Sequence, residues 1–285
     1  MSFDDAYGAL TDHDDDARWA YGTGFADPLA GVPTAIPAEV DPADLAAYCL
    51  MLGDDALIMS HRLQQWVTRT PELEDEVAVA NIALDLLGQA RLLLTRAGEA
   101  AGDGRGEDAL AYQRAAGDFR NVQLAERADP DFAHLMARLL VFTTWRLALL
   151  DRLAGAPDPV LAAIGAKGVK EVTYHREYAA GWVVRLGDGT EVSHRRMQDA
   201  MDAVWPLIEE LFRPYEVERR MGMDPATLRP EFDAVLTQVL AAATLRAPAA
   251  GDAGGRGREG VHTAALTEIL AEMQGFARSL PGGVW

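Results

Sequence analysis

The chain has 285 residues, of which 49% are hydrophobic, so it is long enough for one large helical domain or two small ones with a substantial core. Its formal net charge of −18 would repel the phosphates of nucleic acids and anionic lipids, which makes nucleic acid and membranes poor candidates for partners. The acidity fits a role in solubility and pairing with a more basic protein equally well.

A single cysteine, Cys49, excludes an internal disulfide framework and a cysteine-ligated metal cluster, and it favours a reducing compartment. The opening sequence MSFDDAYGAL has neither the basic nor the apolar region of a secretion signal. No uncharged run approaches the roughly 18 residues that span a bilayer. We therefore expect a soluble cytoplasmic protein.

Residues 1–40 differ in composition from the rest of the chain. Aspartates alternate there with aromatic residues and prolines, without a helical period. The sequence predicts an acidic, flexible N-terminal arm, either a disordered tail or an extended segment laid over a partner. Residues 41–285 are expected to form one helical domain.

Apolar residues recur at steps of three and four from residue 44 to about 70, which predicts an amphipathic helix. A second helix is predicted from about 72 to 98. Its acidic opening, PELEDE, favours initiation, and its middle is apolar on almost every side. A helix that is apolar all round is typical of the centre of a bundle.

The helical pattern continues to the C-terminus, and no strand-like alternation of useful length interrupts it. A glycine-rich segment at 251–260 is predicted to be a flexible loop. Further helices are predicted near 107–126, 130–154, 158–186, 190–212, 230–245 and 261–279. The sequence thus predicts an all-α fold, in which four long helices form a bundle and additional helices pack on it.

Two segments, DLLGQ at 85–89 and EVTYH at 171–175, resemble the D-E-x-x-H motif of di-iron carboxylate bundles. In that motif the Glu and the His bind iron, and the leading Asp braces a neighbouring His. Here the two glutamate positions hold Leu86 and Val172, which cannot coordinate a metal, and Gln89 replaces one histidine. Both segments therefore lack essential ligands.

The rest of the sequence does not supply the missing ligands. A di-iron centre needs a Glu from each of two helices and a Glu plus a His from each of the other two. The helix predicted at 130–154 has no acidic residue in its interior. Only Asp54 or Asp55, together with His175, could still bind, so we predict no metal site in this chain.

The polar residues that remain in the two segments are expected to pair with one another, because buried polar groups without partners cost free energy. We predict a metal-free cluster in which Asp85 pairs with His175 and Glu171 pairs with Gln89. In the alternative interpretation, Asp85 and Glu171 are solvated and His175 is an ordinary core histidine. No nucleophile elbow or phosphate-binding loop is present, so we assign no catalytic and no cofactor-binding residue.

Long stretches of the sequence, including LGDDALIMSHRLQQW at 52–66 and PELEDEVAVANIALDLLGQARLLL at 71–94, resemble one known family. These are the structural, ferritin-like C-type subunits of the multicomponent phenylacetyl-CoA oxygenases, the ring 1,2-epoxidases of bacterial phenylacetate catabolism. KEVTYH at 170–175 and WVVRLGDGTEVSHRRMQ at 182–198 also match, whereas residues 1–40 and 246–258 fall outside the resemblance.

The resemblance implies that a sister subunit of the same ferritin-like fold carries the di-iron centre and binds the CoA thioester. It further implies a reductase component with FAD and an iron–sulfur cluster, and a role for the C-type chain as a scaffold for the catalytic subunit. It transfers no catalytic residue to this chain.

Three hypotheses follow from the sequence. The first is a non-catalytic subunit of a ring-epoxidising monooxygenase. The second is a self-sufficient di-iron oxygenase or oxidase with unusual ligands such as Asp55, Glu171 and His175. The third is a helical interaction module unrelated to oxygenases.

Overall fold

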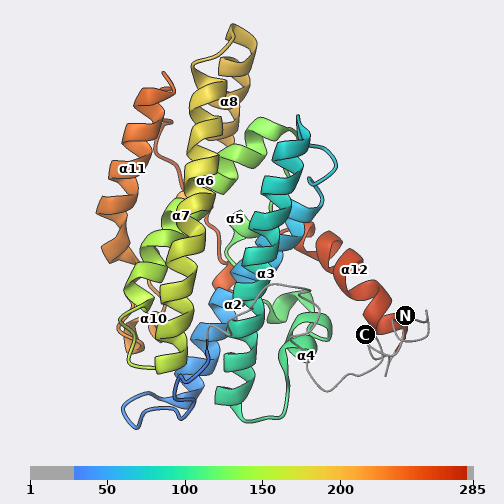
Figure 1. The fold of residues 1–285 in the computed structure, drawn as a ribbon, viewed down its shortest axis with the longest axis vertical. Helices are drawn as coiled ribbons and strands as arrows, with labels where there is room; N and C mark the ends of the chain where they lie inside the picture. Colours follow the sequence, from blue (N-terminus) through green and yellow to red (C-terminus); the bar gives the residue numbers. More distant parts are fainter. Residues whose placement is uncertain (1–28, 281–285) are drawn as a thin grey trace, which may run out of the picture.

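The structure is a computed structural model that describes residues 29–280. Four long helices form a bundle, and they are arranged as two hairpins joined by a long crossover (Figure 1). The helices are α2 (Pro42–Gln64), α3 (Leu73–Ala101), α6 (Phe132–Leu153) and α7 (Pro159–Gly187). Two hairpins and one long crossover are the connectivity of ferritin-like bundles, so the predicted all-α, ferritin-like fold is confirmed.

Aspartate side chains cap three of the four long helices. Asp41 Oδ1 accepts hydrogen bonds from the backbone N–H groups of Ala43 and Asp44, at 2.8 and 3.0 Å, at the start of α2. Asp131 and Asp158 cap α6 and α7 in the same way. Such caps satisfy N–H groups that have no partner within the helix, so local sequence fixes where these helices begin.

Shorter helices cover the bundle. Helix α8 packs on α6 and α7, α11 packs on the same pair, and α12 packs on α2, α4 and α5 (Figure 1). Their bounds are α4 (Glu107–Tyr112), α5 (Gln123–Glu126), α8 (Glu191–Val204), α9 (Ile208–Leu211), α10 (Glu216–Arg220), α11 (Arg229–Ala242) and α12 (Ala264–Ser279). Single 3₁₀ turns lie at Ala116–Asp118, Trp205–Leu207, Pro225–Leu228 and Gly257–Glu259. The described residues contain no β-strand, only an isolated bridge between Arg256 and Val261.

Two predicted helices are shorter or more broken than the sequence pattern indicated. The helix predicted at 190–212 stops at Val204 and gives way to a 3₁₀ turn, because Pro206 cannot donate a backbone hydrogen bond to the preceding turn. The segment predicted at 107–126 is divided into α4, a 3₁₀ turn and α5. There the backbone N–H groups of Arg120 and Val122 bond to buried aspartates of α2 instead of to helical carbonyls.

The predicted N-terminal arm begins outside the described residues, but its last part is visible. We expected residues 29–40 to belong to a flexible arm; instead, Leu29, Val32 and Ile36 pack against the core and Val40 is buried. Arg96 of α3 also donates to the backbone carbonyl of Thr34, at 2.8 Å. These contacts order a segment whose composition by itself indicated none.

Helices α3 and α6 are each long and apolar enough to cross a membrane, judged by length and composition. Most of α6 is enclosed by the other helices, as expected for a core helix. Helix α3 is less than half buried over its most apolar part, so it presents apolar side chains on the surface of the bundle.

Two glycines of α7 differ in their surroundings and give a test of the packing. A Cβ atom added at Gly165 would lie 2.6 Å from the backbone nitrogen of Ala154, whereas one added at Gly181 would meet nothing within 4 Å. We expect Gly165→Ala to destabilise the protein by ~1–3 kcal/mol through overpacking. Gly181→Ala should stabilise it by ~0.5–1 kcal/mol, because alanine loses less backbone entropy in a helix. Chemical denaturation of both variants checks this, and equal effects would contradict the close packing of α7 on α6.

Candidate functional site

The centre of the bundle, where a di-iron site would lie, is filled by side chains. Leu86 of α3 and Val172 of α7, which stand at the two lost glutamate positions, are both fully buried in the core. In α6, Phe142 and Trp145 are buried in the middle of the helix. The missing ligands are thus replaced by packing rather than by an empty space.

Gln89 links the two sides of this centre. Its side-chain Nε2 donates to Glu171 Oε2 at 2.9 Å, and its Oε1 accepts from Arg146 Nε at 2.9 Å. These two partners fix the orientation of the amide, because a carboxylate can only accept and a guanidinium can only donate. The pair of Gln89 and Glu171 predicted from the sequence is therefore present, with Arg146 as a further member.

Arg146 is the residue that the sequence analysis missed. It lies in the second half of α6, is fully buried, and places two further nitrogens 3.4 and 3.5 Å from the carbonyl oxygen of Leu52. Burial lowers the pKa of its guanidinium to about 10, and the negative charge of Asp55 opposes this shift. At neutral pH the side chain remains protonated. A single arginine within an otherwise apolar stretch of helix was the available signal.

The second predicted pair is also present. His175 Nε2 and Asp85 Oδ2 lie 2.9 Å apart, and the histidine is buried while the aspartate side chain is 42% exposed. Glu171, on the preceding turn of α7, also forms an ion pair with Lys167. The polar cluster of Asp85, Gln89, Glu171 and His175 thus extends from the core to the surface along the seam of α3 and α7. The alternative interpretation holds only for the partial exposure of Asp85.

The two acids of α2 that could have bound a metal are bound to arginines. Asp54 pairs with Arg114 of the crossover and accepts from the backbone N–H of Arg120 at 2.8 Å. Asp55 accepts from Arg258 Nη2 at 2.7 Å and from the backbone N–H of Val122 at 2.8 Å. Both carboxylates are fully buried, and their oxygens are already engaged by donors.

The partner of Asp55 comes from the glycine-rich segment at 251–260, which we predicted to be a flexible loop. That prediction was wrong. Arg258 is buried and donates to the carbonyl oxygens of Met51 and Arg120, at 3.0 and 2.7 Å. The glycines serve close packing, since a Cβ atom at Gly257 would lie 2.0 Å from the carbonyl oxygen of Asn121.

These residues do not fit a di-iron centre. Within residues 29–280, no three histidine, cysteine, aspartate or glutamate side chains gather in a way that could hold a metal ion. His175 faces one carboxylate, and Glu171 is engaged by Lys167 and Gln89. The guanidinium of Arg146 would also repel a divalent cation placed at the centre of the bundle.

Comparison with known proteins agrees with the resemblance in the sequence. The family model described as phenylacetic acid catabolic protein matches residues 31–285. The chain belongs to this family. It is 44% identical over 246 residues to the C-type subunit of the 1,2-phenylacetyl-CoA epoxidase of Escherichia coli (strain K12), a match that covers 85% of this chain and 99% of the relative.

Membership in the phenylacetic acid catabolic protein family confirms the predicted resemblance and removes one hypothesis. A helical module unrelated to these proteins is excluded by a match over most of the chain. The matched region begins at residue 31, earlier than the sequence stretches indicated. This start agrees with the packing of residues 29–40 on the bundle.

A second buried cluster of the family member joins the crossover to the C-terminal helix. Glu126 at the end of α5 accepts from His262 Nδ1 at 2.8 Å and from the backbone N–H of Thr263 at 2.6 Å. His262 Nε2 lies 2.9 Å from the carbonyl oxygen of Phe119. Because both ring nitrogens face acceptors, both must donate, and the imidazole is positively charged.

This geometry predicts a pH dependence of stability. Burial favours the neutral ring of His262, but the hydrogen bonds to Glu126 and Phe119 outweigh it and raise its pKa above the ordinary value. A raised pKa in the folded state gives stability that is complete below the unfolded pKa of about 6.5 and is lost as pH rises through the folded pKa.

We therefore expect His262→Gln to lower the free energy of unfolding more at pH 6 than at pH 9. Denaturant unfolding at both pH values measures the difference, and His194→Gln, at a histidine of α8 far along the chain from this cluster, serves as a control. An equal loss at both pH values would show that the imidazole is neutral in the folded protein.

Proposed function

We propose that this chain is a non-catalytic subunit of a multicomponent di-iron monooxygenase that epoxidises the aromatic ring of phenylacetyl-CoA. The relative from Escherichia coli is named as one of the subunits of such an epoxidase. The observation that carries the proposal is the position of Arg146, whose guanidinium bonds to Gln89 at the centre of the bundle. In this proposal a homologous catalytic subunit holds the di-iron centre, and a reductase component with FAD and an iron–sulfur cluster supplies electrons.

The hypothesis of a self-sufficient di-iron oxygenase is less well supported. Its proposed ligands were Asp55, Glu171 and His175, and each of these side chains is bonded to a protein partner. Asp55 and Arg258 form a buried ion pair that a metal would have to break. Removing one partner from such a pair costs roughly 3–5 kcal/mol, so metal binding there would work against folding.

The proposal predicts the metal content of the separate subunits. Chain purified alone and titrated anaerobically with Co(II) should give no ligand-field bands and should retain far less than one equivalent of iron, because the donors at its centre are engaged. The complex with the catalytic subunit should contain iron that stays with that subunit after separation. Near-stoichiometric iron in the isolated chain would support the self-sufficient enzyme instead.

Helix α3 supplies the surface through which we propose that the chain pairs with the catalytic subunit. Leu73, Val77 and Leu84 are exposed along the outer side of α3, and Leu84 is 57% exposed. On the neighbouring helix α7, Tyr174 is 72% exposed. Exposed aliphatic side chains beside a tyrosine are typical of protein interfaces, where aromatic side chains often supply much of the binding energy.

The α3 surface can be tested by pull-down of the catalytic subunit. Leu84→Asp and Tyr174→Ala should each weaken the pairing by ~10-fold or more, because they remove apolar contact area at the centre of the proposed interface. Val192→Asp on α8 is a matched control, since Val192 is also exposed but lies on another helix. Unchanged folding, monitored by circular dichroism, is expected for all three. If the Val192 variant alone disrupts the complex, the interface lies elsewhere.

The cytoplasmic location and the absence of nucleic acid and membrane partners remain part of this proposal. A net charge of −18 supports them, because it opposes binding to phosphate-rich surfaces.

A further inference from the structure

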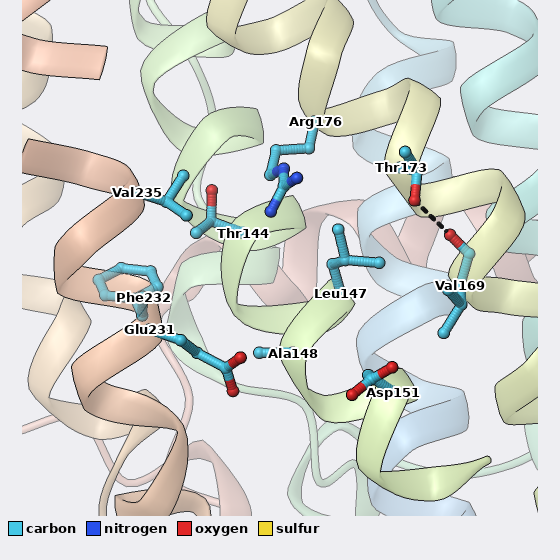
Figure 2. A pocket seen from close by; sticks show the side chains of 10 residues that line it. All are labelled: Thr144, Leu147, Ala148, Asp151, Val169, Thr173, Arg176, Glu231, Phe232 and Val235. Carbon is cyan, nitrogen blue, oxygen red and sulfur yellow. Dashed lines mark hydrogen bonds between the residues drawn. The ribbon is translucent and has the colours of Figure 1, made fainter. Parts of the chain in front are cut away.

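A cavity of about 250 Å³ lies between α6, α7 and α11, apart from the polar cluster described above (Figure 2). On α7 it is lined by Val169, Thr173 and Arg176, whereas Glu171 and His175 of the polar cluster lie toward α3. Its volume is below the roughly 300–1,000 Å³ of pockets for drug-sized ligands, so it suits a small molecule.

Arg176 contributes a cation to this cavity. Within residues 29–280 its guanidinium has no hydrogen bond, no ion pair and no ring contact. A guanidinium offers several donors in a planar fork that matches a carboxylate. An arginine of this kind beside an apolar wall is ready to bind an anion that enters the cavity.

Thr144 of α6 lines the same cavity and is only 2% exposed. Its hydroxyl oxygen has no hydrogen-bond partner among the described residues. The preceding residue, Thr143, is also buried but donates to the carbonyl oxygen of Leu139 at 2.7 Å. A buried hydroxyl without a partner costs free energy, so the partner of Thr144 is expected to come from outside the chain.

The polar groups of the cavity are separated by sign. Figure 2 shows the guanidinium of Arg176 and the hydroxyl of Thr144 in one part of the cavity and the carboxylates of Asp151 and Glu231 in another. Both carboxylates are already paired with Arg152, at 3.1 and 2.7 Å. Apolar side chains form the walls between the two parts, among them Leu147, Phe232 and Val235.

We propose that this cavity binds a small organic monocarboxylate with an apolar body. The carboxylate pairs with Arg176 and accepts a hydrogen bond from Thr144, and the apolar body lies against Leu147 and Phe232. Asp151 and Glu231 would repel a second negative charge at the far end. The site therefore prefers a monocarboxylate to a dicarboxylate of equal length, and this preference does not depend on the proposed role in an epoxidase.

Calorimetric titration of the full chain with hexanoate, hexanamide and adipate tests the proposal. We expect hexanoate to bind with a Kd on the order of 1 mM, which suits a ligand of so few atoms. Hexanamide lacks the charge, and adipate carries a second one, so each should bind ~10-fold more weakly. Equal affinities of hexanoate and hexanamide, or no heat of binding by hexanoate up to ~20 mM, would overturn the proposal.

Two pairs of variants locate the site. Arg176→Gln should weaken hexanoate binding ~10-fold, and Arg195→Gln, on the exposed face of α8, should leave it unchanged. Thr144→Val should weaken binding about fivefold. It should also leave the melting temperature of the free protein unchanged or raised, because it removes a hydroxyl that has no partner.

Thr143→Val is the matched control for Thr144→Val, because its hydroxyl already has a partner within α6. It should leave the affinity for hexanoate unchanged. If Thr143→Val and Thr144→Val weaken binding equally, or if Arg176→Gln has no effect, the ligand does not bind in this cavity.

Discussion

The arrangement of this bundle depends on one constraint: charges enclosed among helices must be neutralised by protein groups. An unpaired buried ion costs several kcal/mol, so each such charge needs a partner at a fixed place. Arg146 meets this requirement at the centre of the bundle through Gln89, which in turn bonds to Glu171. The same amide therefore connects three of the four long helices, α3, α6 and α7.

Ion pairs of the same kind extend this order beyond the bundle. Asp54 and Asp55 of α2 hold Arg114 from the crossover and Arg258 from the C-terminal loop. In a di-iron protein, carboxylates at the centre bind the metals and thereby tie the helices together. Here arginines from distant parts of the chain bind the acids, so segments with little helical tendency are held in place by buried carboxylates.

A bundle stabilised in this way leaves its outer faces available for binding. The exposed apolar side of α3 and the cavity beside α11 lie along different faces of α7, because neighbouring residues on a helix point about 100° apart. Tyr174 belongs to the first face and Thr173 to the cavity. Binding of a protein on one face is therefore compatible with binding of a small molecule on the other.

The sequence by itself determined the helices and the absence of the ligand set. Apolar periodicity and the aspartate caps act within a few residues, so the four long helices and their starts could be predicted from local patterns. The four-residue spacing of Asp85 and Gln89 placed both on one side of α3, and the pairs with His175 and Glu171 followed from the need to satisfy buried polar groups.

Only the tertiary structure decided which charges meet. Asp55 and Arg258 are separated by about two hundred residues, and no local pattern indicates that a glycine-rich segment will insert an arginine beneath α2. Arg146 could be read as a surface residue until packing enclosed it, and Thr144 and Thr143 are identical in sequence terms although one hydroxyl is bonded and the other is not. Pairings over such distances depend on the packing of whole helices, which periodicity along the chain does not specify.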